Sequence, residues 1–380
     1  MKSMRLFVTI ALVTFILLFW TPLTMASSQI IPFDSDRWEI NAKEFKLEDH
    51  LGRKSLFLKG GFAVVKDSEF TDGIIEFDIA IKPERGFMGA VWRLQDPENY
   101  EKFYLRPHQS GNPDANQYTP VFDGLAGWQL YYGEGYGTPI NYLFNKWMHV
   151  KIVVSGKNAE VYIMDMVNPI LFVHELKREV TSGKVGLIAE PTPMLSSQAH
   201  FSNFSYTNMS NPPLKGRTRE PEPVAEGTIM SWLVSETFGE NTLGNKYQIT
   251  KADKKKLVWN RLSCEPSGLA NLARLQGITR EKNTVFARVT VVSEKEQIKQ
   301  LQFGFSDRVK VYLNDQLIYG GNNTFRTRDY RFLGTIGYFD ELYLPLRKGE
   351  NELWLAVSES FGGWGLQARF EDMEGITVKK

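Results

Sequence analysis

The chain has 380 residues, 42% of them hydrophobic, a formal net charge of +1 and a single cysteine, Cys264. This balanced charge attracts neither nucleic acid nor an anionic surface, which argues against a nucleic-acid partner. One cysteine cannot form an internal disulfide, so the fold must rely on buried apolar area, and the length is that of two domains.

The first residues predict export. Lys2 and Arg5 precede an apolar run from 6 to 20, and the small and polar residues TPLTMASSQ follow it. This order is typical of a secretory signal peptide, which we assign to residues 1–27. The apolar run is shorter than the roughly 20 residues that span a bilayer. We therefore expect a secreted or periplasmic protein with no membrane contact after signal cleavage.

Short strand patterns dominate residues 28–206. They are rich in β-branched and aromatic residues and are bounded by Gly, Pro or Asn, and this region has no long helical period. Such spacing indicates a β-sandwich or jelly roll. The expected strands lie at 73–81, 89–94, 102–106, 128–133, 149–156, 159–164, 184–189 and 200–206.

The strand pattern stops between 207 and 227, where the sequence TNMSNPPLKGRTREPEPVAEG is rich in proline and mixed in charge. We predict an interdomain linker there, because little apolar surface is available to bury. Strand patterns resume after it, and residues 228–380 should form a second β-sandwich. The predicted fold class is all-β, with two β-sandwich (jelly-roll) domains joined by a Pro-rich linker.

Residues 100–136 combine aromatic rings with amides, carboxylates, an arginine and a histidine. Aromatic faces cover the apolar CH patches of a sugar, and planar polar groups hydrogen-bond to its hydroxyls. Within this stretch, residues 106–124 are too polar to be a strand, so we predict a long loop that folds back over a sheet and carries function. The predicted ligand-binding residues are Arg93, Arg106, Gln109, Asn112, Asn116, Tyr118, Trp128 and Tyr131.

Strand alternation after this loop leaves two arrangements open. Trp128 and Tyr132 would share one face, and Gln129 and Tyr131 the other. If the more polar face lines the cleft, Tyr131 is the stacking ring and Trp128 belongs to the core. Arg106 could equally form an ion pair with a nearby aspartate, with the amides only building turns.

A rival hypothesis is an enzyme, either a glycoside hydrolase or a polysaccharide lyase. Such catalysis needs two carboxylates, or a histidine and a carboxylate, across a cleft, and the candidates here are His108, Asp114 and Asp123. Their spacing is not diagnostic, so the sequence leaves enzyme activity open. Glu76 and Asp78 share one strand face, which we interpret as a solvated surface.

Metal signals are weak. The 5 histidines are scattered without the close pairing of a zinc site. We expect no cofactor, and calcium is the ion that loop oxygens would bind if one is present. The expected partner is a carbohydrate or glycoconjugate, and the sequence does not indicate an oligomeric state.

Longer segments carry a family resemblance. FTDGIIEFDIAI (70–81), GFMGAVWRLQDPENYEKFYLR (86–106) and FNKWMHVKIVVSGKNAEVYI (144–163), followed by GKVGLIA, resemble the concanavalin A-like lectin/glucanase superfamily, particularly laminin-G-like and 3-keto-disaccharide hydrolase-like domains. Residues 303–321 and 344–370 resemble galactose-binding-like jelly-roll domains. The resemblance implies sandwich folds, which serve lectins, enzymes and scaffolds alike, so a structural or protein-binding module is a third possibility.

The glycine-rich segment SFGGWG, residues 360–365, places two aromatic residues among glycines. This hairpin could present an aromatic ring to a sugar, or it could close over the first domain. Alternatively, Trp364 packs as a structural plug. We favour the plug for Trp364.

Overall fold

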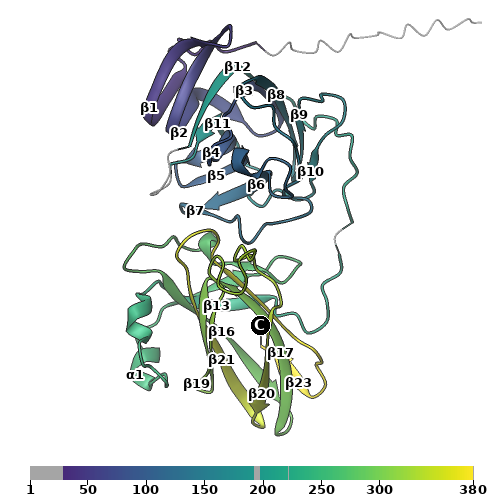
Figure 1. The fold of residues 1–380 in the computed structure, drawn as a ribbon. Helices are drawn as coiled ribbons and strands as arrows, with labels where there is room; N and C mark the ends of the chain where they lie inside the picture. The colour runs from purple at the N-terminus through teal and green to yellow at the C-terminus, as the bar shows by residue number, and fades with distance from the viewer. Residues whose placement is uncertain (1–28, 192–196, 221, 380) are drawn as a thin grey trace, which may run out of the picture.

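The computed structural model describes residues 29–191, 197–220 and 222–379. It shows two all-β domains, one above the other, with the connecting segment running along one side (Figure 1). The predicted signal peptide, 1–27, lies outside the described residues. Within those residues, we find no helix with the length and apolar character needed to cross a membrane.

The strands of the first domain form one continuous hydrogen-bonded set. Its order is β10-β9-β8-β3-β12-β2-β11-β4-β5-β6-β7, and β1 pairs with β2. Their bounds are β1 Trp38–His50, β2 Arg53–Phe70, β3 Gly73–Ala80, β4 Met88–Asp96, β5 Asn99–Leu105, β6 Asn116–Phe122, β7 Leu125–Ala126, β8 Trp147–Ser155, β9 Asn158–Ile163, β10 Leu171–Val173, β11 Gly183–Ala189 and β12 Gln198–Asn208.

Strand β2 joins the two layers of this sandwich. Lys59 pairs with β12, whereas Gly61 pairs with β11, so the two halves of β2 belong to different layers. A β-carbon added at Gly61 would lie 2.1 Å from the carbonyl oxygen of Asn41. Only glycine therefore fits at this point of the β1–β2 pairing. The first layer contains β3, β8, β9, β10 and β12, and the second contains β4 to β7 and β11.

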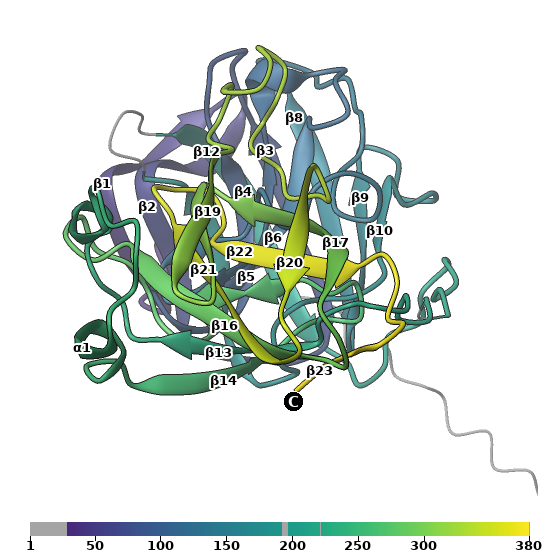
Figure 2. The ribbon, with the colours of Figure 1, turned by 90° about the horizontal axis from the view of Figure 1, so that it is seen from below.

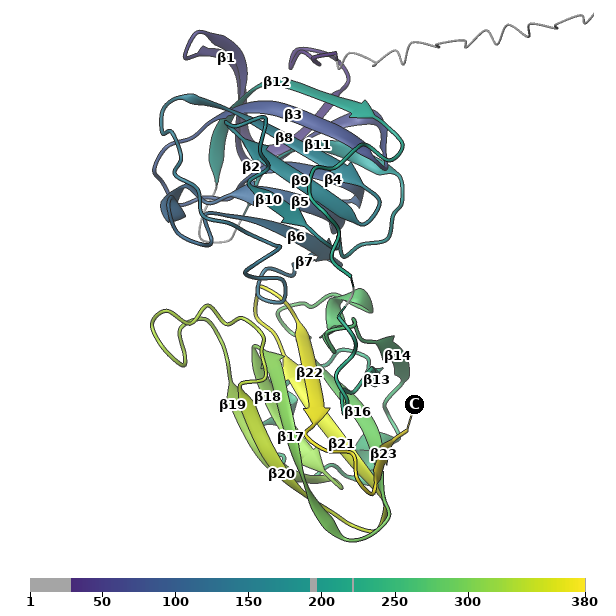
Figure 3. The same cartoon turned by 90° about the vertical axis from the view of Figure 1, so that its right-hand side faces the viewer.

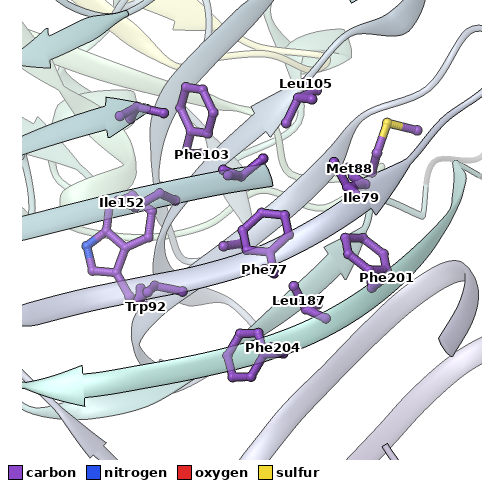
Figure 4. Packing of buried hydrophobic residues seen from close by; sticks show 14 of the residues in the cluster. Phe77, Ile79, Met88, Trp92, Phe103, Leu105, Ile152, Leu187, Phe201 and Phe204 are labelled. Atoms are coloured by element: carbon purple, nitrogen blue, oxygen red, sulfur yellow. The ribbon is translucent and has the colours of Figure 1, made fainter. Parts of the chain in front are cut away.

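Alternating residues of both layers meet in one core. Phe77 and Phe201 come from the first layer, Trp92 and Phe103 come from the second, and all are at most 1% exposed. Figure 4 shows these rings packed together with Leu187. Burying each large side chain contributes roughly 1.5–3 kcal/mol, and this core therefore compensates for the missing disulfide.

The second domain also has two facing sheets (Figures 2 and 3). One has the order β14-β13-β16-β21-β18-β19, with β23 beside β16, and the other has the order β15-β22-β17-β20. The elements are β13 Ser231–Ser235, η2 Glu240–Leu243, α1 Lys251–Lys254, β14 Trp259–Ser263, β15 Ala270–Asn271, η3 Leu272–Arg274, β16 Thr284–Ser293, β17 Gln297–Ser306, β18 Arg308–Leu313, β19 Gln316–Asn322, β20 Asp340–Leu346, β21 Gly349–Ser358, β22 Gly365–Phe370 and β23 Ile376–Val378.

The predicted fold class is confirmed, and so is the plug at Trp364. That side chain is 0% exposed, and its indole nitrogen donates to the carbonyl oxygen of Val357 at 3.1 Å. The predicted linker is not fully detached from the first domain. The backbone nitrogens of Lys215 and Gly216 donate to Glu160 Oε1 at 2.7 and 2.6 Å.

Two local predictions are wrong. Residues 116–122, expected within a loop, form β6, because Tyr118 and Val121 bury apolar surface on opposite faces of the sheet. Pro120 is tolerated because the neighbouring strand β7 pairs only with Val121 and Phe122, beyond the proline. Residues 128–133, expected as a strand, instead form turns.

Candidate functional site

Three residues of the predicted ligand-binding set, Arg93, Asn116 and Tyr118, are at most 1% exposed, and Arg106 and Tyr131, described below, are also buried. The Arg93 side chain is 0% exposed and donates to the carbonyl oxygens of Thr71 and Gly156 and to Asp72 Oδ1. Tyr118 and Asn116 are also 0% exposed, and in this structure none of the three faces a ligand surface. Asn116 and Tyr118 bond instead within the first domain, Asn116 to the carbonyl oxygen of Thr138 and Tyr118 to Glu101 Oε2.

Arg106 lies where β5 ends, on the outer face of the second layer. Phe103 and Leu105 point into the core, so Tyr104 between them points outward, and the Arg106 side chain joins it there. The Arg106 guanidinium donates to the Tyr104 hydroxyl at 2.9 Å, to Gln117 Oε1, and to the carbonyl oxygen of Asp114 at 3.0 Å.

Three aromatic rings pack around the Arg106 guanidinium. Its carbon atom lies 5.1 Å from the ring centre of Tyr104, 5.9 Å from that of Phe87 and 6.0 Å from that of Trp128. We call these four residues the Arg106 ring cluster. Arg106 is 5% exposed, and cation–π attraction to these rings adds to its hydrogen bonds. Phe87 and Trp128 keep part of their surface open.

The loop that follows brings several predicted residues to this cluster. A single 3-10 turn, η1 (Pro107–Gln109), begins it, and the amide of Asn112 donates to Gln109 Oε1 at 2.7 Å. The His108 ring lies edge-on to Phe87 at 5.7 Å. The Asp114 carboxylate is 15% exposed and lies 3.8 Å from the Arg106 guanidinium.

His108 is held in its neutral form. Burial, together with the cations Arg85 and Arg106, lowers the pKa of His108 to about 4. Its Nδ1 atom is buried and has no hydrogen-bond partner among the described residues. A neutral imidazole can hydrogen-bond to a ligand, but with this pKa it is a weak general base at neutral pH.

Asp123 lies away from His108 and Asp114. It occupies the turn after β6, where Asn99 contacts its backbone and side chain. A strand advances about 3.3 Å per residue, so β6 separates Asp123 from Asp114 by roughly 20 Å. The paired carboxyls of glycosidases are less than about 10 Å apart, so these two acids do not form such a pair.

Tyr131 belongs to the contact between the domains. It is 1% exposed, its hydroxyl donates to Glu265 Oε1, and Asn271 donates to that hydroxyl at 3.3 Å. Lys177 of the first domain donates to Glu265 Oε2 at 2.8 Å. Arg274 of the second domain returns a hydrogen bond of 2.8 Å to the carbonyl oxygen of Lys177.

The structure decides between Trp128 and Tyr131, which the sequence left open. Trp128 keeps an exposed part in the Arg106 ring cluster, and Tyr131 is enclosed. The reason is that residues 128–133 form turns, so strand alternation does not apply to them.

The sequence did not predict a second polar cluster, on the outer face of the first layer. His149 Nδ1 lies 2.8 Å from Asp78 Oδ1, and His149 Nε2 lies 3.4 Å from Glu76 Oε1. Arg53 and Asn203 also donate to Asp78. The only sequence signal was the shared strand face of Glu76 and Asp78, and their cationic partners on other strands could not be inferred from it.

Hydrogen bonds to these two carboxylates raise the pKa of His149 to about 9. At neutral pH its charge and that of Arg53 therefore balance the two acids. We interpret this cluster as an ion-paired form of the solvated face that the sequence predicted.

Across the residues that the structure describes, no group of three or more His, Cys, Asp and Glu side chains could hold a metal ion. Calcium bound mainly by carbonyl oxygens would form no such group and stays a prediction. Burial raises the pKa of the Cys264 thiol to about 12, which fits a small packed side chain.

No protein-family model and no curated protein matches this chain. Among solved structures, a carbohydrate-binding module from Bacillus subtilis is 19% identical over 45% of this chain and 94% of its own, with a TM-score of 0.34. A putative glycosyl hydrolase from Parabacteroides distasonis is 14% identical over 46% and 89% of the two chains, with a TM-score of 0.32. A Bacillus licheniformis β-glucanase is 9% identical over 49% and 99%, with a TM-score of 0.33. Scores this low assign no function.

Proposed function

We propose that this protein binds a carbohydrate or glycoconjugate at the Arg106 ring cluster and the loop beside it. The observation that carries the proposal is the packing of Phe87, Tyr104 and Trp128 around one buried guanidinium. This packing fixes the rings before any ligand arrives, which reduces the entropy lost on binding. Partly exposed faces of Phe87 and Trp128 can cover the CH patches of a sugar.

The loop from 107 to 115 supplies the polar half of this surface. Gln109 and Asn112 present amide groups, Asp114 presents a carboxylate, and His108 presents a neutral ring. Amides and carboxylates supply the donors and acceptors that sugar hydroxyls need. A ring-lined base with a polar rim is the usual form of a small-ligand site.

Binding is better supported than hydrolysis at this surface. Asp114 has no second carboxylate among the predicted catalytic residues within reach, because Asp123 lies at the far end of β6. His108, with a pKa of about 4, is poorly matched to proton transfer at neutral pH. We also propose that the protein is exported, on the pattern of residues 1–27.

A glycan array probed with the full chain tests the proposal. We compare the wild type with Trp128→Ala, with the loop double variant Gln109→Ala/Asn112→Ala, and with Tyr343→Ala, which removes a ring 66% exposed in the second domain. We expect glycan signals that fall in the first two variants and persist in the third. The loop variant lies at the surface and should leave the fold intact.

Two outcomes would contradict the proposal. One is a wild type that captures no glycan, which would favour a structural or protein-binding module. The other is equal capture by all variants. Release of shorter sugars from a bound glycan, abolished by Asp114→Asn, would instead favour the hydrolase.

A further inference from the structure

The second domain reaches Trp128 of the Arg106 ring cluster through the tip of a loop that joins its two sheets. The loop between β21 and β22 reaches the first domain near β7 (Figure 3). The ring centre of Phe361, at this tip, lies 6.2 Å from that of Trp128, and the two planes are tilted by 36°. Phe361 is 53% exposed, so it is not simply a core residue that fills the domain contact.

Hydrogen bonds of Gln129 hold both this tip and the loop between β19 and β20 against the first domain. The backbone nitrogen of Gln129 donates to the carbonyl oxygen of Gly362 at 2.8 Å. Its side-chain amide donates to the carbonyl oxygen of Leu333 at 2.9 Å, and its own carbonyl accepts from Ile336 N at 3.1 Å. Gln129 is 1% exposed, and these bonds are therefore shielded from water.

The two glycines after Phe361 are required by this approach. A β-carbon at Gly362 would lie 2.4 Å from Gln129 Oε1 and 2.5 Å from Trp128 Nε1. One at Gly363 would lie 2.9 Å from the Leu130 side chain. Both residues have positive φ, +109° and +145°, which side chains rarely adopt. The sequence SFGGWG therefore suits a tip that presses against the first domain.

We infer that the binding surface is shared by the two domains, with Phe361 as a ligand-contacting residue beside Trp128. This inference rests on the proposed function. Phe87 and Trp128 lie against the same guanidinium, and Phe361 lies beside Trp128, so the two domains together supply three partly open rings. An oligosaccharide can contact several of these rings at once, whereas a single sugar cannot, so the ligand class we assign is an oligosaccharide.

In this proposal, the hydrogen-bonded network around Tyr131 and the Phe361 tip have different roles at the domain contact. Tyr131, Lys177, Glu265 and Arg274 form an enclosed network that holds the domains together. The Phe361 tip stands outside that network and leaves half of its ring surface open. An exposed ring fixed beside another partly exposed ring costs little entropy to bind and can supply much of the affinity.

Titration of the full chain with gluco-, xylo- and fructo-oligosaccharides of increasing length, from the monosaccharide upward, tests the inference. For Phe361→Ala we expect a loss of about tenfold or more with longer oligosaccharides, equivalent to about 1.4 kcal/mol, and little change with monosaccharides. Phe361→Trp should retain the affinity. Tyr343→Ala is the matched exposed-ring control.

The outcomes separate this inference from the function on which it rests. If Trp128→Ala loses affinity and Phe361→Ala binds every oligosaccharide as the wild type does, the shared surface is refuted and carbohydrate binding stands. If Phe361→Ala weakens all lengths equally, the oligosaccharide assignment is wrong. If the wild type binds neither these sugars nor any glycan of the array, both proposals fail.

Discussion

Replacing Glu359 with glutamine should stabilise the protein at neutral and alkaline pH and flatten its pH dependence. Glu359 and Asp307 are 0% and 1% exposed in the second domain, and the backbone nitrogen of Ser360 donates to both carboxylates at 3.1 Å. Glu359 Oε2 and Asp307 Oδ1 have no donor among the described residues. The guanidinium of Arg308 lies 3.8 Å from Asp307 Oδ2. Two carboxylates only accept hydrogen bonds, so this pair needs a proton.

The sign of the effect follows from the direction of the pKa shifts. Burial, followed by the charge of Asp307, raises the pKa of Glu359 well above its ordinary 4.5, and burial also raises the pKa of Asp307. Above pH 4.5 the folded chain therefore keeps a proton that the unfolded chain has released. Stability falls as the pH rises through this window, by up to about 1.4 kcal/mol per pH unit for one retained proton.

Glutamine supplies a permanent N–H donor of nearly the same shape, so Glu359→Gln should remove this loss. Urea unfolding followed by tryptophan fluorescence, at several pH values between about 5 and about 9, measures it. The control is Glu371→Gln, an exposed acid of the same domain. A variant whose free energy of unfolding declines with pH in parallel with the wild type would refute the shared proton.

Two further predictions concern other charged contacts. Because its hydrogen bonds to Asp78 and Glu76 raise the pKa of His149 to about 9, the stability from this contact should be full below about pH 6.5 and lost as the pH rises through 9. NMR titration of the imidazole should give that midpoint, and Asp78→Asn should lower it; an unchanged midpoint would contradict the assignment. Tyr131→Phe leaves Glu265 with one hydrogen-bond donor fewer at the domain contact. We therefore expect the free energy of unfolding in the same urea assay to fall by about 1–2 kcal/mol. An unchanged value would show that the hydroxyl contributes nothing.

The domain contact also explains why aromatic residues are dense between 125 and 136. Tyr131 and Leu130 pack with Leu269 of the second domain, and Tyr136 and Ile336 surround them. An aromatic-rich, glycine-punctuated segment is typical of a sugar surface, and it is equally typical of a buried contact between two domains. What packs against the segment in the folded protein determines whether it is a sugar surface or a domain contact.

The sequence alone determined the architecture of this protein. Alternation at 73–81 and 149–156 places Phe77 and Val150 inward, and both are 0% exposed in the core. Burial of one strand face is a local property that a period of two reveals. The polar loop was recognised around His108, Gln109 and Asn112, but its length was overestimated by the residues of β6.

Only the tertiary structure decided which polar residues meet. Arg93 and Tyr118 are buried, although polar side chains of these types also suit a surface site. Arg93 donates to Asp72 and to the carbonyl oxygen of Gly156, and Tyr118 donates to Glu101. The sequence separates His149 from Asp78 by 71 positions, and the pairing of β8 with β3 brings them to 2.8 Å. A local sequence pattern predicts on which face of a strand a side chain lies. The partners of that side chain depend on which strands and domains pack against that face.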